Sequence, residues 1–166
     1  MSPRPLAQGD LDWVLALNRV HERELSPLTR DRLAELAEAA FRAFVADPEA
    51  GFLLTFDQDA PYDSPNFLWF RERYDRFVYI DRIAIDAAHR RQGHAEALYA
   101  AFFAAARAEG HKVAVCEVNS HPPNPGSDRF HAALGFDVVG EAELAGRGKT
   151  VRYYALDLME PVSERA

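Results

Sequence analysis

The chain has 166 residues, of which 48% are hydrophobic and 27% charged, a composition typical of one soluble globular domain over residues 1–166. The formal net charge of −7 argues against nucleic-acid binding, which usually requires a basic surface. No apolar run approaches the roughly 18 residues of a membrane span, so no membrane partner is expected. The N-terminal residues lack the apolar core of a signal peptide, and the single cysteine, Cys116, cannot form an internal disulfide. These features predict a cytoplasmic protein.

Helical and strand patterns alternate along the first half of the chain. Apolar residues at helical spacing predict one helix within residues 9–21 and a second within 28–40, the second capped by Thr29. Two β-rich runs predict a hairpin over residues 41–57 with its turn at Asp47–Gly51. The charged segment 21–28 is predicted to be a solvated loop. Residues 57–74 contain two prolines and no periodicity, which predicts a long loop.

The second half begins with a long strand within residues 75–86 that is apolar on both faces except at Asp81 and Arg82, as in a central strand. A helix that ends near Gly110 and another strand at 111–119 follow. A short helix follows Asn124, and a terminal hairpin turns around residues 146–149. This order predicts an α/β fold, in which a mixed sheet carries helices on its faces.

The turn between the central strand and the next helix has an unusual composition. The helix begins after "HRRQGHA" without a short acidic or hydroxyl cap, although its first N–H groups lack intrahelical partners and its N-terminus is electropositive. Arg90, Arg91 and Gly93 at such a turn suit a bound anion, and open α/β sheets bind ligands at this end of a strand. Two arginines in a solvated surface turn are the alternative.

Two motifs resemble a known family. Residues 90–95 fit the pattern Arg/Gln-x-x-Gly-x-Gly/Ala, which resembles the acetyl-coenzyme A loop of the GNAT superfamily of N-acetyltransferases. Residues 124–136 resemble its Asn-x-x-Ala-x-x-x-Tyr-x-x-x-Gly-Phe segment, with these residues in register: Asn124, Ser127, His131, Gly135 and Phe136. The resemblance extends to the order of elements. It implies a single-domain, mostly antiparallel twisted sheet with helices on both faces and a splayed central strand pair.

The resemblance also implies acetyl-CoA as acyl-donor cosubstrate. Its pyrophosphate would lie at the turn formed by Arg90, Arg91, Gln92, Gly93, His94 and Ala95, where Gly93 allows the backbone to approach a phosphate. Its pantetheine arm would pair with Ile83, Ala84 and Ile85, whose side chains indicate only core packing. Asn124 would contact the same arm, although an N-cap before Pro125 explains it equally well.

Acetyl transfer to an amine requires a base for the ammonium and benefits from an acid for the leaving thiolate. Glu117 is the candidate base, because a carboxylate is unusual in mid-strand and the resemblance places a base at this position in some family members. A cross-strand ion pair is the alternative, and Asp81 and Tyr79 are rival bases. His131 occupies the position of the family tyrosine and is the candidate acid, a role that an imidazolium can fill near neutral pH.

The implied activity is N-acetylation of a small-molecule or terminal amine by direct attack in a ternary complex. A non-catalytic acyl-CoA-binding module acting as sensor or scaffold is the alternative, favoured by the missing tyrosine. The six histidines are scattered, so no metal is predicted. Acids and aromatics of the 57–74 loop suggest a lid over an amine acceptor, or else a small core beneath the loop; they are Asp57, Asp59, Tyr62, Asp63, Phe67, Trp69, Phe70 and Tyr74. The chain is expected to be a monomer or homodimer.

Overall fold

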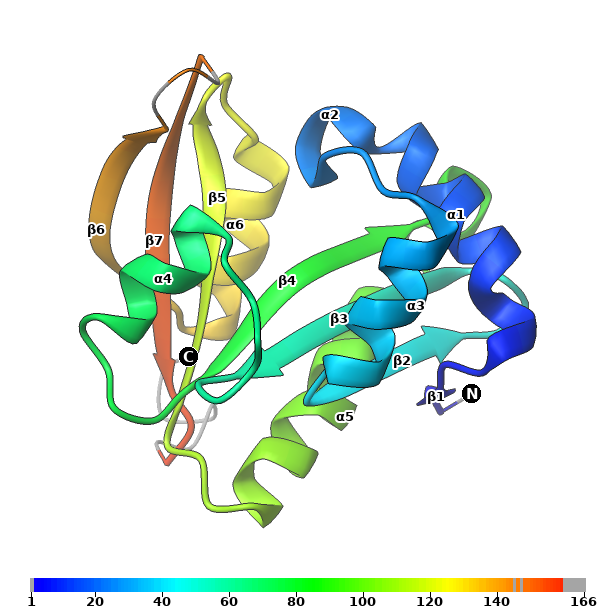
Figure 1. Cartoon of the computed structure of the whole chain (residues 1–166), viewed down its shortest axis with the longest axis horizontal. Coiled ribbons are helices and arrows are strands. Elements are labelled where there is room, and N and C mark those ends of the chain that lie inside the picture. Colours follow the sequence, from blue (N-terminus) through cyan, green and yellow to red (C-terminus); the bar gives the residue numbers. More distant parts are fainter. Residues whose placement is uncertain (1, 145, 147, 160–166) are drawn as a thin grey trace.

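The computed structural model describes residues 2–144, 146 and 148–159. Its strands form one seven-stranded sheet in the order β1-β2-β3-β4-β5-β7-β6 (Figure 1). The strands are β1 (Arg4–Pro5), β2 (Arg42–Ala46), β3 (Gly51–Asp57), β4 (Val78–Ile85), β5 (Val113–His121), β6 (Asp137–Leu144) and β7 (Lys149–Asp157). The helices are α1 (Leu11–Val20), α2 (Glu22–Leu25), α3 (Arg30–Ala39), α4 (Pro65–Arg71), α5 (His94–Ala108) and α6 (Pro125–Leu134), with 3-10 turns η1 (Gln8–Asp10) and η2 (Ala87–His89).

The centre of the sheet holds the one parallel strand pair among the described residues. All neighbouring strands run antiparallel except β4 and β5, which are parallel. These two pair only at Val78 with Ala114 and at Tyr79 with Val115, and beyond these residues they separate (Figure 1). The predicted mostly antiparallel sheet with a splayed central pair is therefore confirmed.

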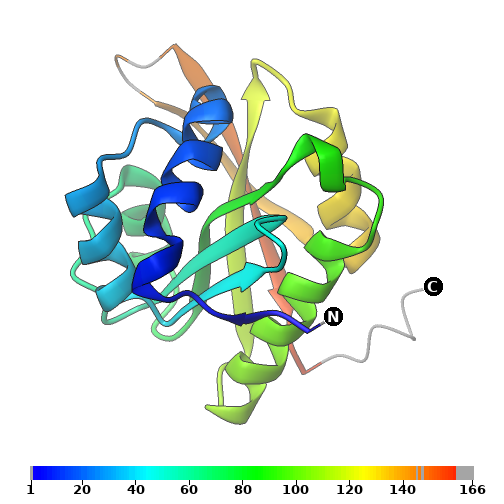
Figure 2. The ribbon, with the colours of Figure 1, turned by 90° about the vertical axis from the view of Figure 1, so that its right-hand side faces the viewer.

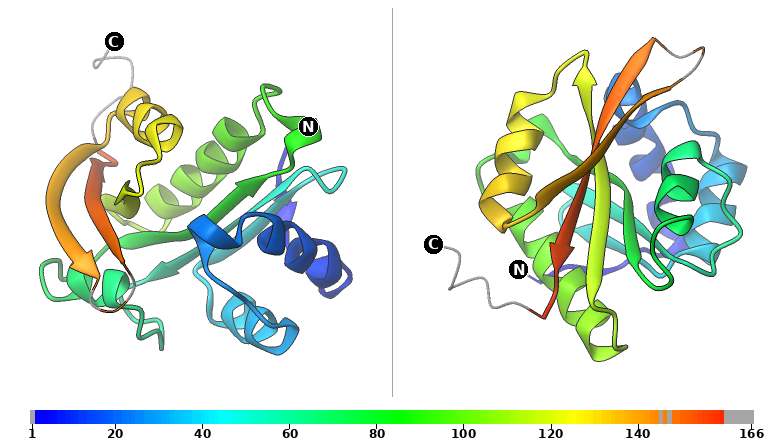
Figure 3. Two further views of the ribbon diagram at one scale, coloured as in Figure 1. Left: turned by 90° about the horizontal axis from the view of Figure 1, so that it is seen from above. Right: turned by 90° about the vertical axis from the view of Figure 1, so that its left-hand side faces the viewer.

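Helices cover both faces of the sheet (Figures 2 and 3). On one face, Phe102 of α5 belongs to a core cluster with strand residues such as Leu53 and Ala114. On the other face, Val14 of α1 and Leu33 of α3 pack with Phe52 of β3. Because these side chains are fully buried, the amphipathic stripes in the sequence account for which side of each helix faces the sheet.

Local signals set several helix boundaries as predicted. The Thr29 side chain accepts a hydrogen bond from the Arg32 N–H at 3.1 Å and so caps α3. Asn124 accepts from the Ser127 N–H at 3.4 Å, and Pro125 is the first residue of α6. The predicted turn at 47–51 does join β2 and β3. Of the predicted turn at 146–149, residue 147 lies outside the described residues, as does residue 145 beside it.

The prediction that residues 57–74 form a loop throughout was wrong. Pro65 begins the helix α4, where a missing N–H is tolerated. Phe67 and Phe70 of this helix are fully buried and contact Phe77. Burial of these side chains against residues outside the helix, rather than periodicity within residues 57–74, therefore accounts for α4. The predicted solvated loop at 21–28 likewise contains the short helix α2.

Candidate active site

A groove of about 720 Å³ runs along the start of α5 and the end of β4. We call it the turn groove. Nine of the ten predicted coenzyme residues line it: Ile83, Ala84, Ile85, Arg90, Arg91, Gly93, His94, Ala95 and Asn124. Gln92 lies in the same turn but is not among the lining residues. The structure thus brings residues 83–85 of β4 and the turn together with the start of α6, and coenzyme binding by these residues remains a prediction.

The backbone of the turn explains the need for glycine. Gly93 is the N-terminal flanking residue of α5 and has φ of +80°, in the left-handed region that side chains disfavour. A Cβ placed there would meet no atom within 4 Å, so the space in front of Gly93 is open. No side chain caps the helix start. Its N–H groups are therefore available to an anion in the groove.

The edge of β4 is exposed toward the same groove. Ile83, Ala84 and Ile85 pair on one side with Leu53, Phe52 and Gly51 of β3. On the other side, β5 has already separated from β4 at this level. Backbone groups on that side can accept an extended ligand as an added strand. The pantetheine interaction predicted for these residues remains a prediction, and this edge geometry supports it.

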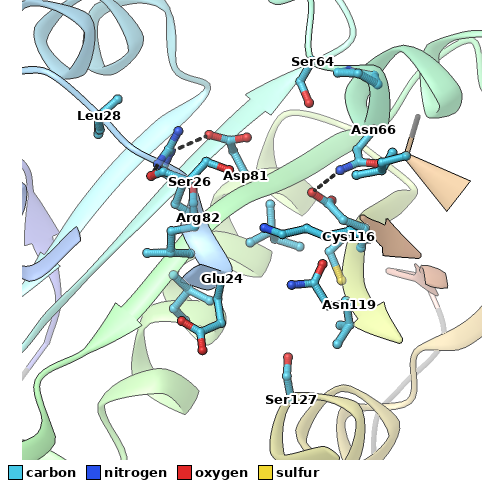
Figure 4. A pocket seen from close by; sticks show the side chains of 18 of the residues that line it. Glu24, Ser26, Leu28, Ser64, Asn66, Asp81, Arg82, Cys116, Asn119 and Ser127 are labelled. Carbon is cyan, nitrogen blue, oxygen red and sulfur yellow. Dashed lines mark hydrogen bonds and ion pairs between the residues drawn. The ribbon is translucent and has the colours of Figure 1, made fainter. Parts of the chain in front are cut away.

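A second cavity, of about 370 Å³, opens where β4 and β5 separate (Figure 4). We call it the inner cavity. Residues from α2, α3, α4, β4, β5, α6 and the start of β7 line it. It meets the turn groove at five shared residues: Glu24, Leu25, Ile83, Asn124 and Ser127. A ligand extended along the groove could therefore present its end to a second molecule in the cavity.

Glu117 of β5 lies on the wall of the inner cavity and is half-buried. The Tyr79 hydroxyl lies 2.8 and 2.9 Å from its two carboxylate oxygens, and Asn66 Nδ2 donates to Oε1 at 3.0 Å, the contact drawn in Figure 4. Burial, and secondly the charge of Asp81, raise the pKa of Glu117 to about 8, although these hydrogen bonds oppose the shift. A carboxyl group with this pKa titrates near neutral pH, as a general base requires.

The rival bases are less suited to accept a proton. Asp81 accepts a hydrogen bond from the Tyr62 hydroxyl at 2.8 Å and pairs with Arg82 Nε at 3.3 Å. Burial raises the pKa of Asp81, but the arginine charge beside it acts in the opposite direction. Burial holds the pKa of Tyr79 well above its usual value, so this residue is a neutral hydroxyl donor. Glu117 remains the best-placed of the three.

His131 is almost fully buried, with 4% of its surface exposed. Its Nδ1 lies 2.8 Å from the Ser127 carbonyl oxygen, which can only accept, so Nδ1 carries the proton. The neutral ring then accepts the Tyr99 hydroxyl hydrogen at Nε2, at 2.8 Å. Burial lowers the pKa of His131, which disfavours the imidazolium. The acid role predicted for His131 remains a prediction, but this geometry favours a positioning role over direct proton donation.

The sequence analysis missed several residues of the inner cavity. Asn66 links Glu117 to the Tyr153 hydroxyl, which donates to Asn66 Oδ1 at 2.9 Å. Arg82 is buried, and its Nη1 donates to Asn18 Oδ1 and to the Leu25 and Ser26 carbonyls, so it ties the α1–α2 segment to β4. The one feature of the sequence that pointed to these residues was the charged pair Asp81-Arg82 within an otherwise apolar strand.

Most aromatics of the supposed lid pack into the core. Trp69 stacks on Tyr153 with ring centroids 4.0 Å apart, and Phe67 and Phe70 are fully buried. Only Tyr62 and Asp63 of the aromatic and acidic set line the inner cavity. Because Phe67 and Phe70 are enclosed and Trp69 lies between Tyr153 and the Arg73 guanidinium, the structure favours the alternative of a small core beneath the loop for these three residues.

Within residues 2–144, 146 and 148–159, no three or more His, Cys, Asp or Glu side chains are grouped to hold a metal ion. In that same part of the chain, no helix has both the length and the hydropathy needed to cross a bilayer.

Comparison with known proteins agrees with this geometry. The model of the acetyltransferase (GNAT) family matches residues 17–136. No curated protein matches the sequence. Among solved structures, smu.2055 from Streptococcus mutans UA159 is 21% identical with a TM-score of 0.74, over 95% of this chain and 99% of that one. The putative acetyltransferase yncA from Salmonella typhimurium, solved with acetyl-CoA, is 20% identical with a TM-score of 0.72, over 97% and 95%.

Arabidopsis thaliana NAA60 in complex with acetyl-CoA is 15% identical, with a TM-score of 0.71 over 93% of this chain and 98% of that one. At such identities these structures establish the fold alone. The family match covers most of the chain, including the turn at 90–95 and the whole of the 124–136 segment. The protein is an α/β acyltransferase by class. It belongs to the acetyltransferase (GNAT) family.

Proposed function

We propose that the protein transfers the acetyl group of acetyl-CoA to a primary amine of a small molecule or a terminal amine. The observation that carries the proposal is the junction of two cavities. The turn groove offers an anion-binding helix start and a free strand edge, and the inner cavity offers Glu117. The two meet at Ile83, Asn124 and Ser127. Complexes of similar proteins with acetyl-CoA support the choice of donor.

In this proposal the turn from Arg90 to Ala95 binds the pyrophosphate through backbone N–H groups and the two arginines. Ile83 to Ile85 pair with the pantetheine arm. The thioester supplies an activated acetyl carbon at the junction. Glu117 removes a proton from the acceptor ammonium, directly or through water, so that the free amine attacks the carbonyl carbon.

The inner cavity restricts the acceptor. Its volume of about 370 Å³ fits a compact amine. Lys149 Nζ donates to the Arg23 carbonyl at 2.9 Å, which joins the start of β7 to α2 beside the cavity. Asp63 on the rim and Asp81 within the cavity add negative charge that attracts an ammonium.

Two measurements test the proposal. Calorimetry should detect CoA binding, and a thiol reagent should detect CoA release when acetyl-CoA is mixed with a panel of compact amines. The Glu117→Gln variant should bind CoA as the wild type does and release far less thiol. Absence of CoA binding would refute the proposal. Binding without release from any amine would instead support a sensor or scaffold.

A further inference from the structure

Ser127 occupies the junction between the two cavities. Of the five residues that line both, it alone carries a hydroxyl group. It lies in the first turn of α6, and Figure 4 shows its hydroxyl directed away from the helix into the cavity. Asn124, also at the junction, already uses its side-chain oxygen to cap α6. The Ser127 hydroxyl is therefore the one hydroxyl donor of the junction among the described side chains, beside the side-chain amide hydrogens of Asn124.

His131 determines how this hydroxyl is oriented. Its protonated Nδ1 donates to the Ser127 carbonyl and lies 3.3 Å from Ser127 Oγ. Because Nδ1 carries a hydrogen, Ser127 Oγ is the acceptor in this contact, and its own hydrogen is free to point elsewhere. Tyr99 fixes the ring by donating to Nε2 at 2.8 Å. In this series of hydrogen bonds from Tyr99 through His131 to Ser127, the hydroxyl hydrogen of Ser127 is the one left over, and it faces the junction.

The cations of the inner cavity are engaged elsewhere. Arg82 is bound to Asp81, Asn18, Leu25 and Ser26. Arg32 pairs with Glu35 at 3.1 Å, and Lys149 donates to a carbonyl of α2. Asp128, next to Ser127 in sequence, accepts from Tyr154 and pairs with Arg152. Cys116 and Glu117, which line the same cavity, bring no positive charge.

We propose that Ser127 donates a hydrogen bond to the coenzyme sulfur as the carbon–sulfur bond breaks, with His131 and Tyr99 as positioning residues. This inference rests on the proposed function. The sulfur leaves with the electron pair of the broken bond, and the amine nitrogen forms the new bond to the acetyl carbon. The nitrogen loses a proton to Glu117 or water, the sulfur gains one from water in the open groove, and Ser127 keeps its own.

The test measures the pKa of the CoA thiol in the complex, which requires no knowledge of the acceptor. The complex with CoA is titrated by the ultraviolet absorbance of the thiolate, and the complex with desulfo-CoA is subtracted to remove tyrosine ionisation. A hydrogen bond to a charged group should lower the thiol pKa in the wild type by about one unit relative to Ser127→Ala. Ser127→Thr, which keeps the hydroxyl, should retain the wild-type value.

Ser64 provides the matched control, since it lines the inner cavity but not the turn groove. Ser64→Ala should leave the thiol pKa unchanged. If the alanine variant of Ser127 does not fold, Ser127→Val compared with Ser127→Thr, which has the same shape, gives the same test of the hydroxyl. Equal thiol pKa values in the wild type and Ser127→Ala would overturn the inference and leave the proposed function intact. Failure of the wild type to bind CoA would overturn both.

Discussion

The turn groove and the inner cavity are built in different ways. The turn groove takes its lining mainly from two short stretches, residues 83–85 and 90–95, joined by the start of α6. The inner cavity is lined by several short runs from elements far apart in the chain, such as residues 24–28, 62–66, 80–83 and 116–119. Hydrogen bonds that join Glu117, Asn66 and Tyr153 connect three of its elements. A site made of one or two neighbouring segments is visible as a motif, whereas a site assembled from many distant segments is not.

The two regions also differ in what a mutation removes. The turn groove presents backbone N–H groups and exposed arginines, so its function depends on the shape of the main chain. The inner cavity holds buried carboxylates with raised pKa values, so its function depends on individual ionisable groups. Substitutions should therefore separate binding from chemistry.

The largest effect is expected in the inner cavity. Glu117→Gln removes the proposed base and should lower turnover by roughly 10²–10⁴ near neutral pH. The loss should shrink at high pH, where free amine is abundant, and wild-type activity should rise through a pH of about 8 as Glu117 ionises. Steady-state kinetics across the pH range measure both. The exposed Glu141→Gln on β6 is the control and should match the wild type. Wild-type turnover in Glu117→Gln at every pH would mean that Asp81, Tyr79 or solvent acts as the base.

The next effect is expected in the turn groove. Gly93→Val adds a side chain to the open space and strains a left-handed residue, so the dissociation constant of CoA should rise at least tenfold, about 1.4 kcal/mol. Turnover at saturating coenzyme should fall less. Gly146→Val is matched for backbone strain, because Gly146 has φ of +75° and also faces open space, but it lies outside the groove. If calorimetry shows an unchanged affinity in Gly93→Val, the pyrophosphate does not bind at this turn.

A third substitution distinguishes packing from acceptor binding beside the inner cavity. Trp69→Ala removes a ring stacked on Tyr153 and covered by Arg73 at 3.9 Å. Loss of such a ring from a packed site costs about 3–5 kcal/mol, so the melting temperature should fall by roughly 5–10 °C. The KM for the amine should change little. Asp63→Asn on the cavity rim should instead raise the KM for the amine and leave the melting temperature nearly unchanged. A raised KM with unchanged melting in Trp69→Ala would restore the lid interpretation.

The smallest effect concerns stability and pH. Because burial raises the pKa of Glu117 to about 8, the folded protein retains a proton that the unfolded chain releases above the usual glutamate pKa of 4.5. Stability contributed by this group is therefore present below that value and is lost as pH rises through about 8. Glu117→Gln should match the wild type in melting temperature at acidic pH and exceed it at alkaline pH. A difference independent of pH would contradict the raised pKa.

The candidate site was predictable in part. Residues of the turn and Asn124 were predicted from contiguous patterns whose backbone conformation follows from local chemistry, whereas the β4 edge was predicted only from the family resemblance and its position. Glu117 was identified because a carboxylate is rare in a strand. Asn66 could not be identified from the sequence, because it lies in α4 and this helix forms through burial against other parts of the fold. The ring of Tyr99 belongs to the core, but the partner of its hydroxyl depends on how α5 packs against α6.

The sequence by itself determined the alternation of elements, the apolar stripes, the caps at Thr29 and Asn124, and the turn at Gly93 before α5. These properties depend on residues within a few positions of one another. Tertiary structure decided the separation of β4 from β5, the inner cavity between them, and the raised pKa of Glu117. It also decided which hydrogen-bond partner each ring nitrogen of His131 has. Burial and hydrogen bonding between distant segments set ionisation and orientation, and no local pattern encodes those contacts.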